Sequence, residues 1–234
     1  MSLLEVQHID TGYGKKQVLY DVDLTVKEGE TVLVIGSNGS GKSTLFKAIY
    51  GIVPVWNSSE QGKVLFDGAD VTNKKSHSLI KKGIMYVPQK NELFDDMTVG
   101  QNLEMSLLHL NNKKESKKRV EEVFAQIGML ANKRKQIASK LSGGERKLLS
   151  LGMVLANRPK MVLYDEPLAG LSGNNVSMVL RWLHATKENG TTLVIIEHRI
   201  KELLSMTNKV VGLKLGRRNI ETLDNLERIK SFMI

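Results

Sequence analysis

A glycine-rich stretch with one lysine and two hydroxyls is the part of the chain best suited to hold phosphate. It fits the pattern G-x-x-x-x-G-K-[ST] and consists of Gly36, Ser37, Asn38, Gly39, Ser40, Gly41, Lys42, Ser43 and Thr44. The glycines let the backbone turn tightly, so that successive N–H groups converge on a β-phosphate. We expect Lys42 to reach the β- and γ-phosphates and Ser43 to ligate Mg²⁺. The alternative is an ordinary glycine-rich turn.

Two adjacent carboxylates follow a fully apolar run. Residues 161–164 are apolar, and Asp165, Glu166 and Pro167 come next. In a parallel sheet, ligands bind at the carboxyl ends of the strands, where the phosphate loop also lies. Asp165 is therefore placed to hold Mg²⁺ through a water, opposite Ser43. Glu166 is placed to orient or deprotonate the water that attacks a γ-phosphate.

A third motif is a capping box with two glycines inside it. Ser142 and Glu145 have the S-x-x-E spacing, and Gly143 and Gly144 leave the backbone between them open to close approach. On its own, a capping box usually caps a helix and does nothing else. Here it would be a second anion-binding helix start in a chain with one predicted magnesium site, and this duplication calls for an explanation.

Strands and helices must bring these motifs together. Residues 3–35 read as an antiparallel β-layer that leads into a central strand, and residues 91–151 have helical periodicity. Strands alternate with helices, which implies a parallel sheet covered on both faces. The further elements that we expect are strands at 31–35, 63–66, 83–88, 161–164 and 192–196, helices at 45–49, 148–155, 174–187 and 223–232, and a hairpin at 210–220.

The composition is that of a globular chain of 234 residues with 41% hydrophobic residues. No apolar run reaches the roughly 18 residues that cross a bilayer, the start does not look like a secretion signal, and the absence of cysteine excludes disulfides and fits a reducing cytoplasm. The formal net charge of +9 is scattered in short basic runs with few aromatics between them. Solvated faces explain these runs best, although membrane proximity or a binding role also fits them.

Taken in this order, residues 36–44, 141–147 and 161–167 resemble the motifs of the ATP-binding subunit of an ABC transporter, and the likeness covers essentially the whole chain. It implies an α/β P-loop NTPase core with a mainly parallel sheet, an N-terminal antiparallel β-subdomain and an inserted helical subdomain. Residues 1–89 and 152–234 would form the core, and residues 90–151 the helical subdomain. In the family two subunits pack head to tail, so Ser142 and Gly144 would bind the γ-phosphate of the ATP held by the partner.

The resemblance assigns roles to three further residues. Tyr13 matches the aromatic that stacks on adenine, Gln89 the glutamine that touches Mg²⁺ and the attacking water, and His198 the histidine that contacts the γ-phosphate. Without the family, Tyr13 would be a turn tyrosine and Gln89 a loop glutamine. Two positions depart from the pattern. Ser172 replaces an aspartate that communicates across the dimer, and Met153 replaces a common arginine, which puts the strength of cross-dimer coupling in doubt.

The resemblance implies an ATPase with ATP and Mg²⁺ as cofactors, working at the inner face of the cell membrane with transmembrane permease subunits. Residues 83–89 and 93–103 look most like importers of branched-chain amino acids. Lipopolysaccharide-exporting ATPases share much of this pattern, including the Glu197-His198 ending. The dimer would pair two copies or this chain with a sister subunit. A soluble ATPase that acts on nucleic acid and a regulatory module with little turnover are the rival classes; we expect no specific nucleic acid partner.

Overall fold

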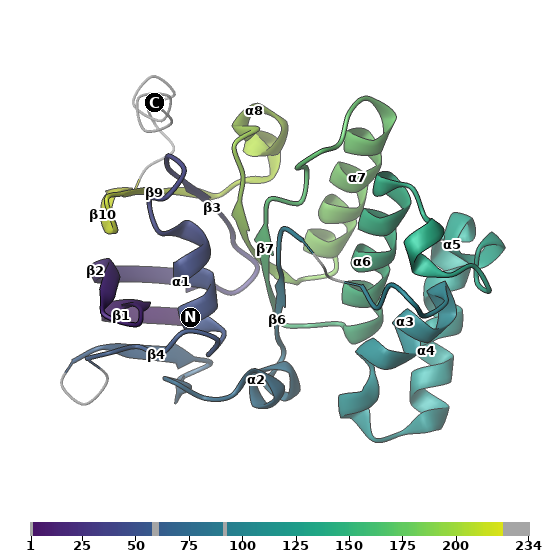
Figure 1. Ribbon diagram of the computed structural model, residues 1–234, viewed down its shortest axis with the longest axis horizontal. Helices are drawn as coiled ribbons and strands as arrows, with labels where there is room; N and C mark the ends of the chain where they lie inside the picture. The colour runs from purple at the N-terminus through teal and green to yellow at the C-terminus, as the bar shows by residue number, and fades with distance from the viewer. Residues whose placement is uncertain (1, 58–60, 91–92, 222–234) are drawn as a thin grey trace.

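The computed structural model describes residues 2–57, 61–90 and 93–221, and Figure 1 shows their arrangement. The strands are β1 (Ser2–Tyr13), β2 (Lys16–Lys27), β3 (Thr31–Ile35), β4 (Lys63–Phe66), β5 (Ala69–Asp70), β6 (Ile84–Val87), β7 (Met161–Asp165), β8 (Thr192–Ile196), β9 (Lys209–Lys214) and β10 (Arg217–Glu221). The α-helices are α1 (Lys42–Ile49), α2 (Ser76–Lys82), α3 (Val99–Ser106), α4 (Lys113–Gln126), α5 (Gly128–Asn132), α6 (Gly143–Asn157), α7 (Asn174–Glu188) and α8 (Ile200–Leu203).

The larger sheet is mixed but mainly parallel, as predicted. Its strand order is β10-β9-β3-β8-β7-β6, and only the β9–β10 pair among these described neighbours is antiparallel. Every residue of β3, β7 and β8 is buried, which explains why their sequences are continuous apolar runs. The carboxyl ends of β3, β6, β7 and β8 therefore point to one edge of this sheet.

The smaller sheet is antiparallel and has the order β2-β1-β4-β5, which confirms the predicted N-terminal β-layer. Helix α1 lies between it and the larger sheet (Figure 1). Their shared core takes alternate residues of each central strand: Val32 and Val34 of β3 face this side, with Leu45 and Phe46 of α1. The phosphate-loop helix is thus held between two layers.

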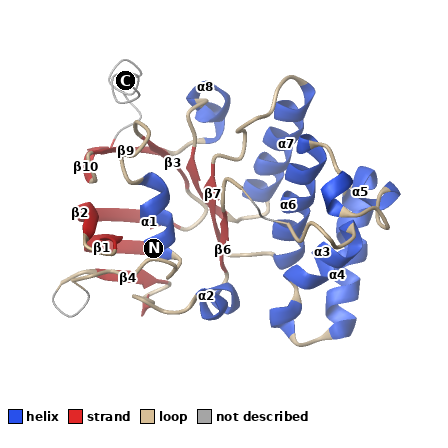
Figure 2. Ribbon diagram, in the orientation of Figure 1, coloured by secondary structure: helices blue, strands red, loops and turns tan. Residues whose placement is uncertain are grey.

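Helices cover the opposite face of the larger sheet. Leu33 and Ile35 of β3 pack there with Val154 of α6 and Val179 of α7, and Figure 2 shows these helices in blue on that side. A third cluster joins α3, α4, α5 and one face of α6. Helix α6 contributes to both clusters and extends past residue 151, so it links the helical segment to the sheet. Among the described residues, no helix is both long and apolar enough to cross a bilayer.

Several predicted elements need correction. The helix expected at 148–155 begins five residues earlier, because its first turn is polar and capped rather than apolar. Helix α2 was not predicted, since Leu79 is its one buried residue. The helix expected at 223–232 lies outside the described residues.

Candidate active site

The predicted phosphate loop joins β3 to α1 and is built by close backbone contacts. A Cβ on Gly36 would lie 2.3 Å from the carbonyl oxygen of Leu213, and one on Gly41 would lie 2.4 Å from the Cδ2 atom of Leu19. Gly41 is also the N-cap of α1 and has a left-handed φ of 103°. Neither position accepts a side chain, so the neighbouring strands β2 and β9 fix the path of this loop.

Lys42 points back into its own loop. Its Nζ donates to the carbonyl oxygens of Gly36 and Ser37, at 2.9 and 3.0 Å. Burial lowers the pKa of Lys42, and the negative charges of Glu166 and Asp165 oppose that shift. A phosphate oxygen is a stronger acceptor for this ammonium than either carbonyl. The Ser40 hydroxyl is also buried here, with no hydrogen-bond partner among the described residues. These groups suit an anionic ligand.

Asp165 ends β7 beside the phosphate loop. Its side chain is nearly buried, and burial raises the pKa of its carboxyl group, while hydrogen bonds from Ser43 and Tyr86 oppose the shift. The Tyr86 hydroxyl donates to Asp165 Oδ2 at 3.3 Å. A buried carboxylate next to a hydroxyl offers the hard oxygen ligands that Mg²⁺ prefers, and a cation would offset the cost of burying its charge. The donor set therefore fits magnesium.

Glu166 lies between the two other residues that we expected to be catalytic. The amide Nε2 of Gln89 donates to Glu166 Oε2 at 2.5 Å, and His198 Nε2 lies 3.3 Å from Glu166 Oε1. The three residues follow β6, β7 and β8, so the parallel sheet brings them together from distant parts of the sequence. Glu166 has a left-handed φ of 53°, which is unfavourable for a glutamate and common at functional sites.

The second predicted helix start lies on the other side of the larger sheet from α1. Ser142 is the N-cap of α6: its hydroxyl accepts from the Glu145 N–H, and its own N–H donates to the Glu145 carboxylate. Next to it, Gly144 is packed so closely that an added Cβ would lie 2.6 Å from the Asn175 side chain, whereas Gly143 has open space around it. Within one chain, Ser142, Gly143 and Gly144 therefore do not join the phosphate loop.

Tyr13 and the two departures from the family pattern lie at different depths. Tyr13 ends β1 and is 48% exposed, with Lys47 Nζ of α1 5.9 Å from its ring centre. An exposed ring next to the phosphate-loop helix can stack on a base. Ser172 is exposed in the loop before α7, and Met153 is buried in the core of the helical segment.

Sequence reasoning missed two side chains at this edge of the sheet. Tyr86 contacts Asp165 from within β6, and Glu197 binds the backbone around His198. Both lie in stretches that resemble the family, but a tyrosine in an apolar strand and a glutamate after one do not by themselves indicate a role. Only the register of β6 against β7, which pairs Val87 with Tyr164, places Tyr86 beside its partner.

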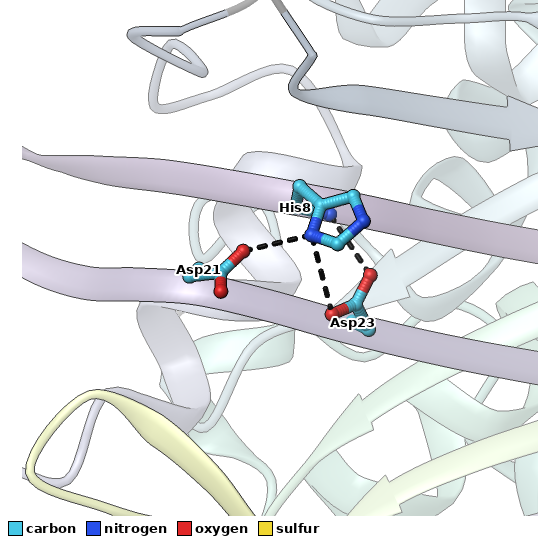
Figure 3. A group of neighbouring side chains, drawn as sticks. All are labelled: His8, Asp21 and Asp23. Atoms are coloured by element: carbon cyan, nitrogen blue, oxygen red, sulfur yellow. Dashed lines mark hydrogen bonds and ion pairs between the residues drawn. The ribbon is translucent and has the colours of Figure 1, made fainter.

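The remaining histidine cluster lies elsewhere. His8 of β1 is on the surface, beside Asp21 and Asp23 of β2 (Figure 3). Its Nδ1 lies 2.8 Å from Asp21 Oδ1, and this hydrogen bond, with the charge of Asp23, raises the pKa of His8. The group is an exposed ion pair on the smaller sheet, on strands that carry neither Asp165 nor Glu166.

Comparison with known proteins decides the family. The profile of the ABC transporter family matches residues 19–169, which include all three motifs. The chain belongs to the ABC transporter family. It is an ABC ATPase, which binds ATP and couples its hydrolysis to transport.

Relatives with different cargoes are equally similar. The chain is 30% identical to the lipopolysaccharide export system ATP-binding protein LptB of Haemophilus influenzae, over 93% of this chain and 89% of LptB. It is 30% identical to the high-affinity branched-chain amino acid transport ATP-binding protein BraG of Pseudomonas aeruginosa, over 92% of this chain and 90% of BraG. It also resembles a crystal structure of the ADP conformation of MJ1267, an ATP-binding cassette of an ABC transporter. The TM-score is 0.82 and the sequence identity is 30%, over 99% of this chain and 94% of MJ1267. These likenesses establish the ATPase and leave the cargo open.

Proposed function

We propose that this ABC ATPase hydrolyses ATP with Glu166 as the general base. The observation that carries the proposal is the contact of the Glu166 carboxylate with both Gln89 and His198. In this scheme Glu166 takes a proton from the attacking water, the Gln89 amide orients that water, and His198 contacts the γ-phosphate. Ser43, Asp165 and Gln89 would hold Mg²⁺, which neutralises charge on the phosphates when bound.

The nucleotide would be held by residues of two chains. Lys42 and the backbone of the phosphate loop would bind the phosphates, and Tyr13 would stack on the adenine. Ser142, Gly143 and Gly144 of a second subunit would complete the site from the opposite side of the γ-phosphate. The arrangement of α1 and α6 on opposite faces of the larger sheet supports this, because one chain cannot bring both helix starts to one ATP. Each dimer would contain two such sites.

Hydrolysis by the Glu166→Gln variant tests the catalytic assignment. A general base contributes about 10²–10⁴-fold, so we expect the ATPase rate to fall by at least about 100-fold with nucleotide affinity retained. Removal of divalent cation with EDTA should abolish hydrolysis by the unmodified chain. An unchanged rate in Glu166→Gln would contradict the assignment and favour a regulatory module in which this glutamate does no chemistry.

For the cargo, we propose branched-chain amino acids. Two features support this: the resemblance of residues 83–89 and 93–103 to that subgroup, and the similarity to BraG. The equal similarity to LptB favours lipopolysaccharide as the second candidate. Uptake of radiolabelled leucine by cells with and without this chain separates the two. Loss of uptake on deletion, restored by the unmodified chain but not by Glu166→Gln, is the expected result; normal uptake with lipopolysaccharide retained in the inner membrane would support the second candidate.

A further inference from the structure

A buried carboxylate lies directly before His198, and the sequence motifs assign it no role. Glu197 follows β8 and is 3% exposed. Its Oε1 accepts the Leu168 N–H at 2.9 Å, while its Oε2 accepts the N–H groups of His198 and Arg199 at 2.7 and 3.1 Å. Burying a charge is costly unless hydrogen bonds replace its water. These three bonds meet that condition, so the carboxylate is tied firmly to the backbone.

The three donors belong to two separate segments. Leu168 lies two residues after Glu166, whereas His198 and Arg199 begin the turn into α8. The Glu166 N–H still donates to the Ile196 carbonyl at 2.9 Å, next to the last paired residues of β7 and β8. Beyond that point the strands no longer pair, and hydrogen bonds to the Glu197 side chain join the two segments.

This connection bears on the geometry of the candidate active site. Glu166 is held in a left-handed conformation, which persists only where the surrounding structure restrains the backbone. Its own N–H is fixed by Ile196 on one side, and the segment after it is fixed by Glu197 through Leu168. The same carboxylate fixes the backbone of His198, whose ring lies 3.3 Å from Glu166.

We propose that Glu197 is a positioning residue that sets the placement of His198 relative to Glu166. It acts through the backbone of both segments and is too buried to meet ATP. The inference rests on the proposed roles of Glu166 and His198 in hydrolysis. If it is right, Glu197 controls the rate of the chemical step and leaves nucleotide binding to the phosphate loop.

Glutamine cannot replace this carboxylate. Two oxygens accept three N–H groups, whereas a glutamine side chain has one oxygen and an NH₂ group that only donates. If the glutamine oxygen accepts from His198 and Arg199, the NH₂ group faces the Leu168 N–H and cannot accept from it. In the reverse orientation, the N–H groups of His198 and Arg199 lose their acceptor. Either way, one tie between the segments is lost while size and shape are kept. Glu197→Asp loses the reach to Leu168 in a different way, because its side chain is one methylene shorter.

The experiment measures ATPase kinetics of the purified full-length chain. We expect Glu197→Gln to lower kcat by roughly 10- to 100-fold, the cost of a misplacement of about 1 Å, and to change the KM for ATP by less than about twofold. The matched control is Glu202→Gln on the same segment, whose carboxylate lies 3.0 Å from Arg199 and does not contact Leu168 or His198; its kcat should stay unchanged. Glu197→Asp should show the same loss of kcat and serves as the test if Glu197→Gln does not fold.

A double-mutant cycle with His198→Ala separates positioning from general damage. In the His198→Ala background, Glu197→Gln should cost less than about threefold, because there is no imidazole left to position. Equal losses in both backgrounds would overturn the proposal, as would an unchanged kcat or a loss confined to KM. The proposed function is tested separately. Normal ATP hydrolysis by Glu166→Gln and His198→Ala would contradict the roles of Glu166 and His198 themselves. Impaired hydrolysis by those two variants with normal hydrolysis by Glu197→Gln would contradict only the positioning role of Glu197.

Discussion

The two helices that begin at glycine motifs, α1 and α6, differ in how their first N–H groups are satisfied. Helix α1 starts at buried Gly41, and no side chain of the described residues caps it. Helix α6 starts at exposed Ser142, which forms a complete capping box with Glu145. Uncapped N–H groups at a buried helix start need a ligand, whereas capped ones are stable without it. The comparison suggests that α1 is the permanent nucleotide site and that α6 engages a phosphate only when a second subunit arrives.

Lys42→Ala should give the largest effect, because it removes the one cation inside the α1 loop. We expect ATP affinity of the isolated chain to fall by about 100-fold, since charge-assisted hydrogen bonds are worth about 1.5–3 kcal/mol each. Isothermal titration with a non-hydrolysable ATP analogue measures it, with Lys82→Ala at the exposed end of α2 as the control. Unchanged ATP affinity in Lys42→Ala would contradict the assignment of the α1 start, rather than the α6 start, as the nucleotide site of the isolated chain.

Gly144→Ala tests the α6 side of the comparison. The isolated chain should bind ATP within about twofold of normal, because α1 is untouched, but ATP-induced pairing should weaken by about tenfold or more, since a methyl group hinders the approach of a phosphate to this backbone. Light scattering in the Glu166→Gln background measures the pairing.

The control for Gly144→Ala is a second substitution at its neighbour. The added methyl group also meets the Asn175 side chain, so the double variant Gly144→Ala/Asn175→Ala relieves that contact. Pairing should remain weak in the double variant and be normal in Asn175→Ala alone. Recovery in the double variant would show that internal packing, and not a phosphate, is what requires the glycine.

The smallest effect concerns the pH dependence of the α6 cap. A hydrogen bond from Lys133 and the backbone N–H of Ser142 lower the pKa of Glu145 from its ordinary value of 4.5. The unfolded chain therefore takes up this proton first on acidification, so the stabilisation is present above about pH 4.5 and is lost as the pH falls below it. Glu145 is partly exposed, which limits the effect to about 1 kcal/mol.

Urea unfolding between about pH 6 and 3 should show a shallower loss of stability in Glu145→Gln than in the parent or in Glu104→Gln. Equal slopes would mean that the cap contributes nothing.

The sequence allowed the buried strands to be predicted better than the exposed helices. Residues 192–196 and 31–35 form strands with the predicted bounds, because a short apolar β-branched run has few other structures open to it. Helix α2 buries one side chain and left no such pattern, whereas the polar first turn of α6 could be recognised only by its capping box.

The candidate site could be predicted only as separate motifs. Glu166 was expected from its place after an apolar strand, and Gln89 and His198 from the family resemblance. Their mutual contacts depend on the register of β6, β7 and β8. The role of Glu197 could not be predicted from the sequence, because it depends on three backbone N–H groups. The two segments that provide these groups meet only in the folded chain.

The mass of the Glu166→Gln chain in solution, by size-exclusion chromatography with light scattering, tests the central claim most directly. With hydrolysis blocked, the closed dimer should accumulate. We predict a monomer without nucleotide and a dimer with ATP and Mg²⁺, as expected if α6 of one subunit completes the α1 site of the other. A chain that stays monomeric at saturating ATP, or one that is dimeric regardless of ATP, would contradict the claim that the nucleotide joins two copies of this chain.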